Sequence, residues 1–248
     1  MRVIITAGGS GIGFAMGQAF AAQGAQVWVT DLDVSAVPEG WHATAVDVSD
    51  EAGMAALFAD LETEWGGLDV LCANAGVAGP TALVEDVELE DWKACVSVNL
   101  EGAFLAAKFA APLMKRQGSG AMVLTSSTAG IYGYPNRAPY AAAKWGVIGL
   151  MKTLAMELGP FGIRANAICP GAVEGARMEG VLEREAAAKG MTRDAVYAGY
   201  ASGTSMRSFV EAADVANMAV FLGSDAARLV SGQVIAVDGH TENPDPKV

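Results

Sequence analysis

Residues 2–13 read RVIITAGGSGIG, and an apolar-periodic segment over 14–24 follows them. The apolar run at 2–6 is typical of a central parallel strand, the glycines indicate a tight turn, and the periodic segment predicts a helix. Glycines at such a turn let the backbone approach a pyrophosphate, and the helix N-terminus offers it unpaired N–H groups and a positive dipole end. A turn that merely packs a helix on a strand explains the same glycines, so the rest of the chain has to decide.

The alternation of strand and helix continues along the chain. Near-continuous apolar strands with short connections are typical of a parallel sheet covered on both faces. With right-handed crossovers this predicts an α/β doubly wound fold, with about seven parallel strands and helices on both faces, in one domain over residues 1–248. The expected strands are 2–6, 25–30, 42–46, 68–72, 121–124, 163–168 and 234–237, and the expected helices are 14–24, 50–65, 88–114, 140–158 and 214–222.

Two local signals refine this plan. Ser49 is expected to cap the helix over 50–65, and Gly66 with Gly67 is expected to end it. Residues 173–208 carry more charge, more Gly and Met, and weaker apolar periodicity than their surroundings. We expect this stretch to form one or two mobile helices that act as a lid over a binding site.

Composition excludes several classes of protein. The chain has 248 residues, 52% of them hydrophobic, and a formal net charge of −12, which argues against nucleic acid or an anionic membrane as a partner. No run of eighteen apolar residues indicates a membrane span, and the apolar N-terminal run is too short for a signal peptide. Three cysteines without paired spacing and two distant histidines predict reduced core thiols in a cytoplasmic protein and no metal site.

An acidic residue stands at the end of the second expected strand. Asp31 follows Gly13 by eighteen residues, close to the spacing of a carboxylate that holds the ribose hydroxyls of NAD. Such a carboxylate repels a 2′-phosphate, and no basic residue between Asp31 and Glu39 offsets it, so NAD is favoured over NADP. The alternative is that Asp31 caps a helix.

A tyrosine and a lysine four residues apart carry the strongest chemical signal. Tyr140 and Lys144 lie on one face of the expected helix, where the ammonium favours the phenolate and lowers the pKa of the tyrosine. Ser127 follows the apolar run 121–124, at a strand end where open α/β sheets bind ligands. Taken alone, a Tyr–Lys pair at this spacing is more often a surface pair on an amphipathic helix, so the functional interpretation depends on the rest of the chain.

Polar or small residues stand at two further positions of interest. Asn99 lies within an apolar helical stretch and needs a hydrogen-bond partner if it is buried. A single bond to the backbone would satisfy it, whereas a functional asparagine would hold a water or orient a lysine. Residues 73–76, Ala-Asn-Ala-Gly, follow a strand and suit a turn that passes close to a ligand.

Together these pieces resemble the short-chain dehydrogenase/reductase family over nearly the full chain, which implies a Rossmann-like fold. The resemblance rests on TAGGSGIG at 6–13, Asp31, Asp47, ANAG at 73–76, Asn99, Ser127, YAAAK at 140–144 and PG at 170–171. It implies Tyr140 as general acid/base, Lys144 lowering its pKa and holding the nicotinamide ribose, Ser127 binding the reacting oxygen and Asn99 supporting a proton relay. It also implies a homotetramer. The implied cofactor-binding residues are Ser10, Gly11, Ile12, Gly13, Asp31, Leu32, Asp47, Val48, Asn74, Ala75, Gly76, Tyr140, Lys144, Pro170, Gly171 and Val173.

The sequence departs from the family pattern at two places. Ala7 stands where the family has glycine, and Gly8 with Gly9 is expected to take up the strain of the turn. No threonine follows the Pro170-Gly171 pair to hold the nicotinamide amide, so backbone groups around Val173 are expected to replace it.

The substrate is expected to be a small polar secondary alcohol: a polyol, a sugar or a hydroxy acid. Ser127 and Tyr140 would bind the reacting oxygen, while Arg137 or Arg177 would bind a carboxylate or hydroxyls. For either arginine, an ion pair at the surface or between subunits is the alternative interpretation.

Three other functions stay open at this level. A 3-oxoacyl-carrier-protein reductase shares the motifs, although it normally uses NADP and docks an acidic carrier through basic residues. An aromatic or steroid alcohol is the second, because Met178, Met191 and Met206 could form an adaptable apolar wall. A non-catalytic dinucleotide sensor is the third, and it predicts a broken set of catalytic residues, whereas all four are present.

Overall fold

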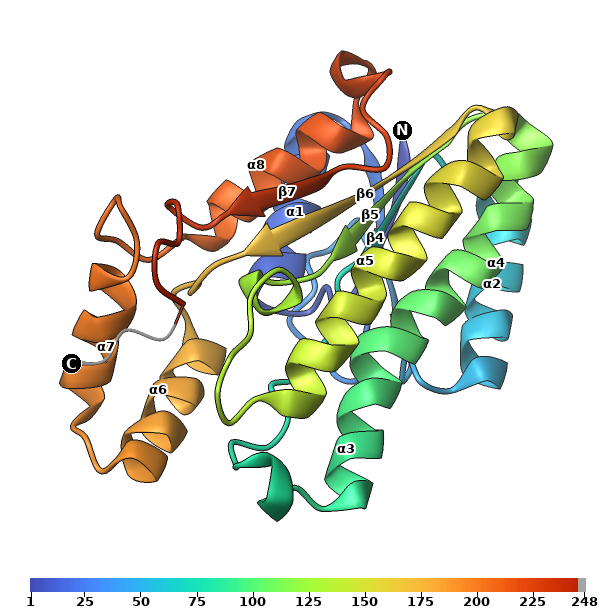
Figure 1. The fold of residues 1–248 in the computed structure, drawn as a ribbon. Helices are drawn as coiled ribbons and strands as arrows, with labels where there is room; N and C mark the ends of the chain where they lie inside the picture. Colours follow the sequence, from blue (N-terminus) through green and yellow to red (C-terminus); the bar gives the residue numbers. More distant parts are fainter. Residues whose placement is uncertain (245–248) are drawn as a thin grey trace.

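A computed structural model describes residues 1–244, and the expected domain range of 1–248 extends four residues beyond them. One sheet of seven parallel strands runs through these residues in the order β3-β2-β1-β4-β5-β6-β7 (Figure 1). The predicted doubly wound fold is therefore confirmed. The strands are β1 (Arg2–Thr6), β2 (Gln26–Asp31), β3 (His42–Ala45), β4 (Val70–Ala73), β5 (Gly120–Thr125), β6 (Ile163–Pro170) and β7 (Val234–Val237).

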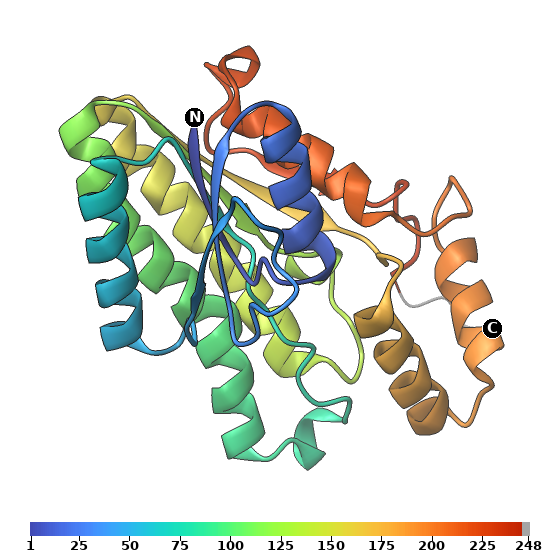
Figure 2. The ribbon, with the colours of Figure 1, turned by 180° about the vertical axis from the view of Figure 1, so that it is seen from behind.

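Helices cover both faces of the sheet and divide the core in two. On one face lie α2 (Glu51–Trp65), α4 (Gly102–Gln117) and α5 (Ala138–Leu158), and on the other lie α1 (Gly11–Ala22) and α8 (Ala212–Gly223) (Figure 2). The central strands are buried on both faces, as all four residues of β4 show. Their apolar side chains pack into two clusters, one beneath each helical layer. Because both faces of these strands are buried, their sequences are continuous apolar runs.

The strand order reverses between β1 and β4. The chain moves outward from β1 to β3 on one side and from β4 to β7 on the other. Open α/β sheets bind their ligands at the carboxyl ends of the strands at such a switch point. The turn after β1, the ANAG segment after β4 and Ser127 after β5 all lie at this edge.

The segment Leu89–Gln117 is one long helical stretch that changes register in its middle. It comprises α3 (Leu89–Val96), the π-helical η2 (Ser97–Glu101) and α4. Among residues 1–244 it is the one stretch long and apolar enough to cross a membrane. Its apolar side chains pack into the core beneath α2 and α5, and core helices of globular proteins meet the same length and composition test. We therefore assign it to the core.

Two further helices lie beyond the carboxyl ends of β6 and β7 (Figure 1). They are α6 (Ala176–Lys189) and α7 (Arg193–Ser202), which pack on each other through a small apolar cluster around Leu182 and Val196. Both fall within the stretch 173–208, so the expected helices are present there, and the lid role stays a prediction. Short helical turns complete the chain at η1 (Val84–Asp86), η3 (Thr128–Gly130), η4 (Gly159–Phe161) and η5 (Asp225–Ala227).

Two local expectations were wrong. Asp50, not Ser49, caps α2, because the Asp50 carboxylate accepts the backbone N–H of Ala52 at 3.1 Å while Ser49 bonds back to Asp47. In the turn after β1, Gly8 and Gly9 were expected to take up the backbone strain. Ala7 itself has a φ of 52°, so part of the strain lies on a residue with a side chain. A left-handed conformation costs a residue with a Cβ about 1–2 kcal/mol.

The three cysteines are buried and free, in agreement with their expected role as core thiols. Burial raises the pKa of the Cys72 thiol to about 12. Burial also raises the pKa of Cys95 and of Cys169. Thiols with raised pKa values are poor nucleophiles, so we assign these residues to packing.

Candidate active site

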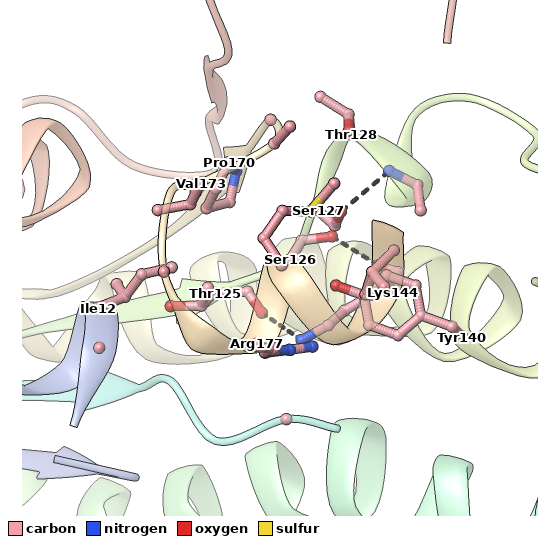
Figure 3. Close-up of a pocket in the computed structure, with 18 of the residues that line it drawn as sticks. Ile12, Thr125, Ser126, Ser127, Thr128, Tyr140, Lys144, Pro170, Val173 and Arg177 are labelled. Carbon is pink, nitrogen blue, oxygen red and sulfur yellow. Dashed lines mark hydrogen bonds between the residues drawn. The ribbon is translucent and has the colours of Figure 1, made fainter. Parts of the chain in front are cut away.

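A cavity of about 340 Å³ opens at the carboxyl edge of the sheet. Its walls come from the glycine-rich turn, the ends of β4 and β5, the start of α5, and the segment between β6 and α6 (Figure 3). Pockets of this size hold small ligands. The lining of this cavity contains many of the residues predicted from the sequence: Ser10, Gly11, Ile12, Asn74, Gly76, Ser127, Arg137, Tyr140, Lys144, Pro170, Gly171, Val173 and Arg177.

Tyr140, near the start of α5, is surrounded by three cations. The Lys144 ammonium lies 5.8 Å from the centre of its ring, the Arg137 guanidinium 4.9 Å and the Arg177 guanidinium 5.9 Å. Burial raises the pKa of the Tyr140 hydroxyl, but Arg177, Lys144, a hydrogen bond with Ser127 and Arg137 together outweigh it and hold the pKa below its ordinary value. The phenolate is thus accessible nearer neutral pH, as a proton acceptor requires.

Lys144 is buried, and its position is fixed by the end of β5. Its ammonium donates a hydrogen bond of 2.8 Å to the backbone carbonyl of Thr125 (Figure 3). The Ser126 hydroxyl in turn donates to the backbone carbonyl of Lys144 at 2.8 Å, which holds this turn of α5 against the strand. Burial lowers the pKa of Lys144, and the nearby Tyr140 opposes this effect.

Ser127 caps the short helix η3 and lies two residues after the end of β5. Its hydroxyl oxygen accepts the backbone N–H of Ala129 at 3.1 Å. The same side chain is within hydrogen-bonding range of Tyr140, where it helps to lower the pKa of the phenol. A strand end and a helix start thus place two hydroxyl groups at one wall of the cavity.

Asn99 lies behind the cavity in the π-helical turn η2 and is fully buried. Its amide nitrogen donates to the backbone carbonyls of Val77 at 3.0 Å and Cys95 at 2.9 Å. Its Oδ1 atom has no hydrogen-bond partner among the described residues. A Cβ on Gly76 would lie 2.6 Å from this oxygen and 3.2 Å from the Lys144 ammonium, so glycine alone leaves room between the two.

The glycine-rich turn is held against its neighbours by close backbone contacts. A Cβ on Gly13 would lie 2.0 Å from the carbonyl oxygen of Ala7, which leaves no room for a side chain. The Asn74 amide donates to the carbonyls of Thr6 at 3.2 Å and Ala7 at 3.3 Å. The turn after β1 and the ANAG segment after β4 are therefore fixed to each other across the switch point.

Asp31 ends β2 beside the same turn but outside the cavity. One carboxylate oxygen accepts the backbone N–H of Gly9 at 3.0 Å, and the other accepts that of Leu32 at 2.8 Å. The next residue, Leu32, is exposed. The carboxylate is thus oriented by the turn itself, which differs from the helix-cap alternative.

Comparisons with known proteins agree with this geometry. The family model described as enoyl-(acyl carrier protein) reductase matches residues 6–240. A trans-4-hydroxycyclohexanecarboxylate dehydrogenase of Sinomonas cyclohexanicum is 36% identical, covering 95% of this chain and 90% of its own. The chain belongs to the short-chain dehydrogenase/reductase family.

Two further relatives show the range of this family. A 3-oxoacyl-[acyl-carrier-protein] reductase of Thermotoga maritima is 35% identical over 95% of this chain and 95% of its own. The crystal structure of an NAD⁺-bound xylitol dehydrogenase superposes with a TM-score of 0.92 at 27% identity, covering 96% of this chain and 97% of that one. The chain is thus a short-chain oxidoreductase of the kind that acts on alcohols and ketones.

Several predicted residues of this short-chain dehydrogenase lie around the cavity rather than in its lining. Gly13 and Ala75 support the turns, Asn99 lies behind Gly76, and Asp31 with Leu32 stands at the end of β2. Asp47 and Val48 follow β3. Asp47 accepts the Ser49 hydroxyl at 2.7 Å, and Val48 is buried against Gly102.

The residues present fit the nicotinamide dinucleotide that this family uses. Two features support this fit: the space at Gly76 beside the unpartnered Asn99 oxygen, and the Asp31 carboxylate beside the glycine-rich turn. No threonine follows Pro170-Gly171, and the backbone of this segment pairs with the chain at Val210. Val173 pairs with Val210 through the groups of its neighbours Ala172 and Glu174, so this pairing leaves the N–H of Val173 unused.

Sequence reasoning missed the residues that form the outer wall. Tyr134 shares a hydrogen bond of 3.0 Å with Thr128, and burial raises the pKa of Tyr134 to about 12. Tyr200 of α7 donates a 2.6 Å hydrogen bond to Glu185, and Glu185 lies 3.7 Å from Arg137. Arg137 and Glu185 lie 48 positions apart in the chain, and no local pattern marks their contact.

Proposed function

We propose that the chain is an NAD-dependent dehydrogenase that interconverts a small polar secondary alcohol and its ketone, with Tyr140 as general acid/base. The observation that carries the proposal is the position of Tyr140 among Lys144, Arg177 and Ser127, which lowers the pKa of the phenol. Oxidation of an alcohol needs a base that takes the hydroxyl proton, and a tyrosine with a lowered pKa beside a small-ligand cavity can act as that base.

In alcohol oxidation the carbinol carbon loses a hydride and its hydroxyl loses a proton. The bound nicotinamide supplies the hydride acceptor. Tyr140 accepts the hydroxyl proton as a phenolate, and Ser127 donates a hydrogen bond that stabilises the charge on the reacting oxygen. Lys144, held by Thr125, keeps the phenolate favoured, and Asn99 supports a water-mediated proton path near the lysine.

The proposed cofactor is NAD rather than NADP. Asp31 presents a carboxylate where a ribose would be bound, and the charge of this group opposes a 2′-phosphate. The similarity to an NAD⁺-bound xylitol dehydrogenase supports the same assignment. Ser10, Gly11 and Ile12 would hold the pyrophosphate, Tyr140 with Lys144 the ribose, and the backbone of Val173 the nicotinamide amide.

The proposed substrates are polyols, sugars and hydroxy acids. The outer wall carries the hydroxyls of Thr128 and Tyr134 and the cations Arg137 and Arg177, which suits a polar molecule. Relatives named for a hydroxycyclohexanecarboxylate and for xylitol support this class. The α6–α7 segment would act as the lid over it.

We further propose a cytoplasmic homotetramer. Phe104 of α4 and Trp145 and Met156 of α5 are exposed large apolar side chains, and a subunit interface across these two helices would cover them. Size-exclusion chromatography with light scattering tests this assembly directly.

Reduction of a 3-oxoacyl group on a carrier protein is the second candidate. The Thermotoga maritima relative favours it, and the family description shares with it a substrate on a carrier protein, although it names reduction of an enoyl and not of a 3-oxoacyl group. Asp31 and the net charge of −12 oppose it, because NADP and an acidic carrier would both meet negative charge. Turnover of acetoacetyl-carrier protein with NADPH, faster than turnover of any free alcohol with NAD, would favour this candidate.

The test is a panel of initial rates with NAD and NADP on polyols, aldoses, short hydroxy acids and aryl alcohols. We expect NADH formation with one polar class. An Asp31→Asn variant should lower the preference for NAD over NADP by about 10- to 100-fold, because the repulsion of the 2′-phosphate is removed. The matched control Asp33→Asn, two residues further on, should leave the preference unchanged. Faster turnover of the unmodified enzyme with NADP would overturn the cofactor assignment.

A further inference from the structure

Arg177 holds a charge in the cavity that no acidic side chain within residues 1–244 balances. Its guanidinium lies 5.9 Å from the centre of the Tyr140 ring, on the wall formed by the start of α6 (Figure 3). Among residues 1–244, no carboxylate forms an ion pair with it and no protein acceptor takes a hydrogen bond from it. An arginine beside a reaction centre with no protein partner has its five N–H donors free for a ligand.

The acidic side chains near this wall are already engaged elsewhere. Glu174, the one carboxylate in the cavity lining, accepts a 2.8 Å hydrogen bond from Tyr197 of α7. Glu185 lies behind the wall, where it accepts from Tyr200 and pairs with Arg137 and Lys189. The lining therefore holds three cations and one carboxylate in a chain whose net charge is −12. This local excess of positive charge favours an anionic ligand.

Arg137 differs from Arg177 in its surroundings. It is buried, it donates a 3.2 Å hydrogen bond to the backbone carbonyl of Ala78, and Glu185 of α6 faces it at 3.7 Å. Its charge is thus offset by the protein, and its contacts join α6 to the loop after β4. Arg137 supports the wall, and Arg177 is the cation left for the substrate.

We propose that Arg177 binds the carboxylate of the substrate, so that the preferred substrates are hydroxy acids rather than neutral polyols or sugars. This inference rests on the proposed dehydrogenase function. A guanidinium binds a carboxylate through two parallel charge-assisted hydrogen bonds, which fixes the orientation of the acid as well as its position. With the carboxylate at Arg177, the hydroxyl of a short hydroxy acid can reach Tyr140 and Ser127.

The test compares a hydroxy acid with its uncharged primary amide. The acid chosen is the hydroxy acid that gives the highest rate in the panel. The value of kcat/KM for the acid and for its amide is measured with saturating NAD. The enzymes compared are the unmodified enzyme, Arg177→Ala, Arg177→Lys and the control Arg184→Ala. Arg184 is an exposed arginine two turns further along α6. Each value is taken on the high-pH plateau, where Tyr140 is ionised in every variant. The effect of Arg177 on the pKa of Tyr140 then does not contribute to the difference between variants.

We expect Arg177→Ala to lower kcat/KM for the acid by about 10- to 100-fold, the loss typical of a hydrogen-bonded charged group. The amide should change less than about threefold, the lysine variant should be intermediate, and Arg184→Ala should resemble the unmodified enzyme. Simple carboxylates without a hydroxyl should inhibit the unmodified enzyme competitively and lose this inhibition in Arg177→Ala.

Three results would overturn the inference. Equal losses for the acid and the amide would make Arg177 a general support of the site. A loss of NADH affinity in Arg177→Ala, measured by fluorescence titration, would assign the guanidinium to the cofactor. Turnover of neutral alcohols in preference to acids would contradict carboxylate binding by Arg177 but would support the proposed dehydrogenase function. Absence of turnover with every alcohol would contradict both proposals.

Discussion

The Lys144 ammonium is bonded to the Thr125 carbonyl, at 2.8 Å, rather than to a carboxylate. The bond fixes the position of the ammonium at the end of β5, and no carboxylate in the described part of the chain pairs with it. Charge in a buried site acts strongly on nearby groups because little solvent screens it. The charge of Lys144 therefore acts on Tyr140, one helical turn earlier in α5, and lowers the pKa of its hydroxyl.

Replacement of Lys144 by Met should keep the length of the side chain and remove its charge. We expect kcat/KM for alcohol oxidation near neutral pH to fall by about 100- to 10,000-fold, because proton transfer to Tyr140 becomes unfavourable. The control is Lys152→Met on the same helix, where the ammonium also bonds to a backbone carbonyl, that of Gly232 at 2.6 Å, but at the surface. An equal loss of activity in both variants would show a packing effect instead.

The direction of the pH dependence follows from Tyr140. Its pKa is held below the ordinary value of 10.0 despite burial, through Arg177, Lys144, Ser127 and Arg137. The phenolate accepts the proton in oxidation, so the rate of oxidation should rise with pH and level off above this lowered pKa. The rate of ketone reduction needs the protonated phenol and should fall over the same interval.

Profiles of kcat/KM in both directions measure this midpoint. Arg177→Ala should move it to higher pH, because the cation that lowers the pKa of Tyr140 most is lost. A midpoint for oxidation at or above 10 in the unmodified enzyme would contradict the assigned electrostatics.

Gly76→Ala should damage the site while leaving the fold in place. The added Cβ would lie 2.6 Å from Asn99 Oδ1 and 3.2 Å from the Lys144 ammonium, closer than these atoms can approach without a shift. We expect NADH to bind at least about tenfold more weakly. A tenfold rise in Kd needs a loss of only about 1.4 kcal/mol of binding free energy, which displacement of these atoms is expected to cause. The control is Gly149→Ala on α5, where an added Cβ meets open space. Unchanged NADH binding in Gly76→Ala would remove Gly76 from the proposed cofactor site.

Ala7→Gly should stabilise the protein slightly. Ala7 has a φ of 52°, a region that is unfavourable for any residue with a Cβ. Relief of about 1–2 kcal/mol of strain is partly offset by the greater chain entropy of glycine, so a gain of up to about 1 kcal/mol in the free energy of unfolding is expected. Urea denaturation measures it. A loss of stability would mean that the Ala7 methyl group contributes packing that exceeds the strain.

Much of the fold could be predicted from the sequence because each of its signals is local. Continuous apolar runs mark strands buried on both faces, and every expected strand is present within two residues at each end. Gly66, with a φ of 66°, ends α2 as expected. The Tyr140–Lys144 pair could be placed on one helical face by spacing alone, and Ser127 by its position at a strand end.

The parts that could not be predicted depend on contacts across the chain. The π-helical turn that carries Asn99 is one such part, because the sequence of residues 88–114 reads as one regular helix, whereas Asn99 is placed beside Gly76 only in the folded chain. The pairing of Arg137 with Glu185 joins residues 48 positions apart. Ala7 takes the left-handed conformation and its carbonyl lies close to Gly13, whereas the sequence suggested that Gly8 and Gly9 would absorb the strain.

The most direct test of the account is the initial rate of NADH formation from the best alcohol of the panel by the unmodified enzyme and by Tyr140→Phe. The substitution removes one hydroxyl group and keeps the ring among its three cations. The account predicts a loss of at least about 100-fold in kcat with NADH affinity retained, as expected when a general acid/base is removed. A Tyr140→Phe enzyme that keeps most of its activity, with NADH bound as tightly as before, would contradict the central claim that Tyr140 transfers the proton.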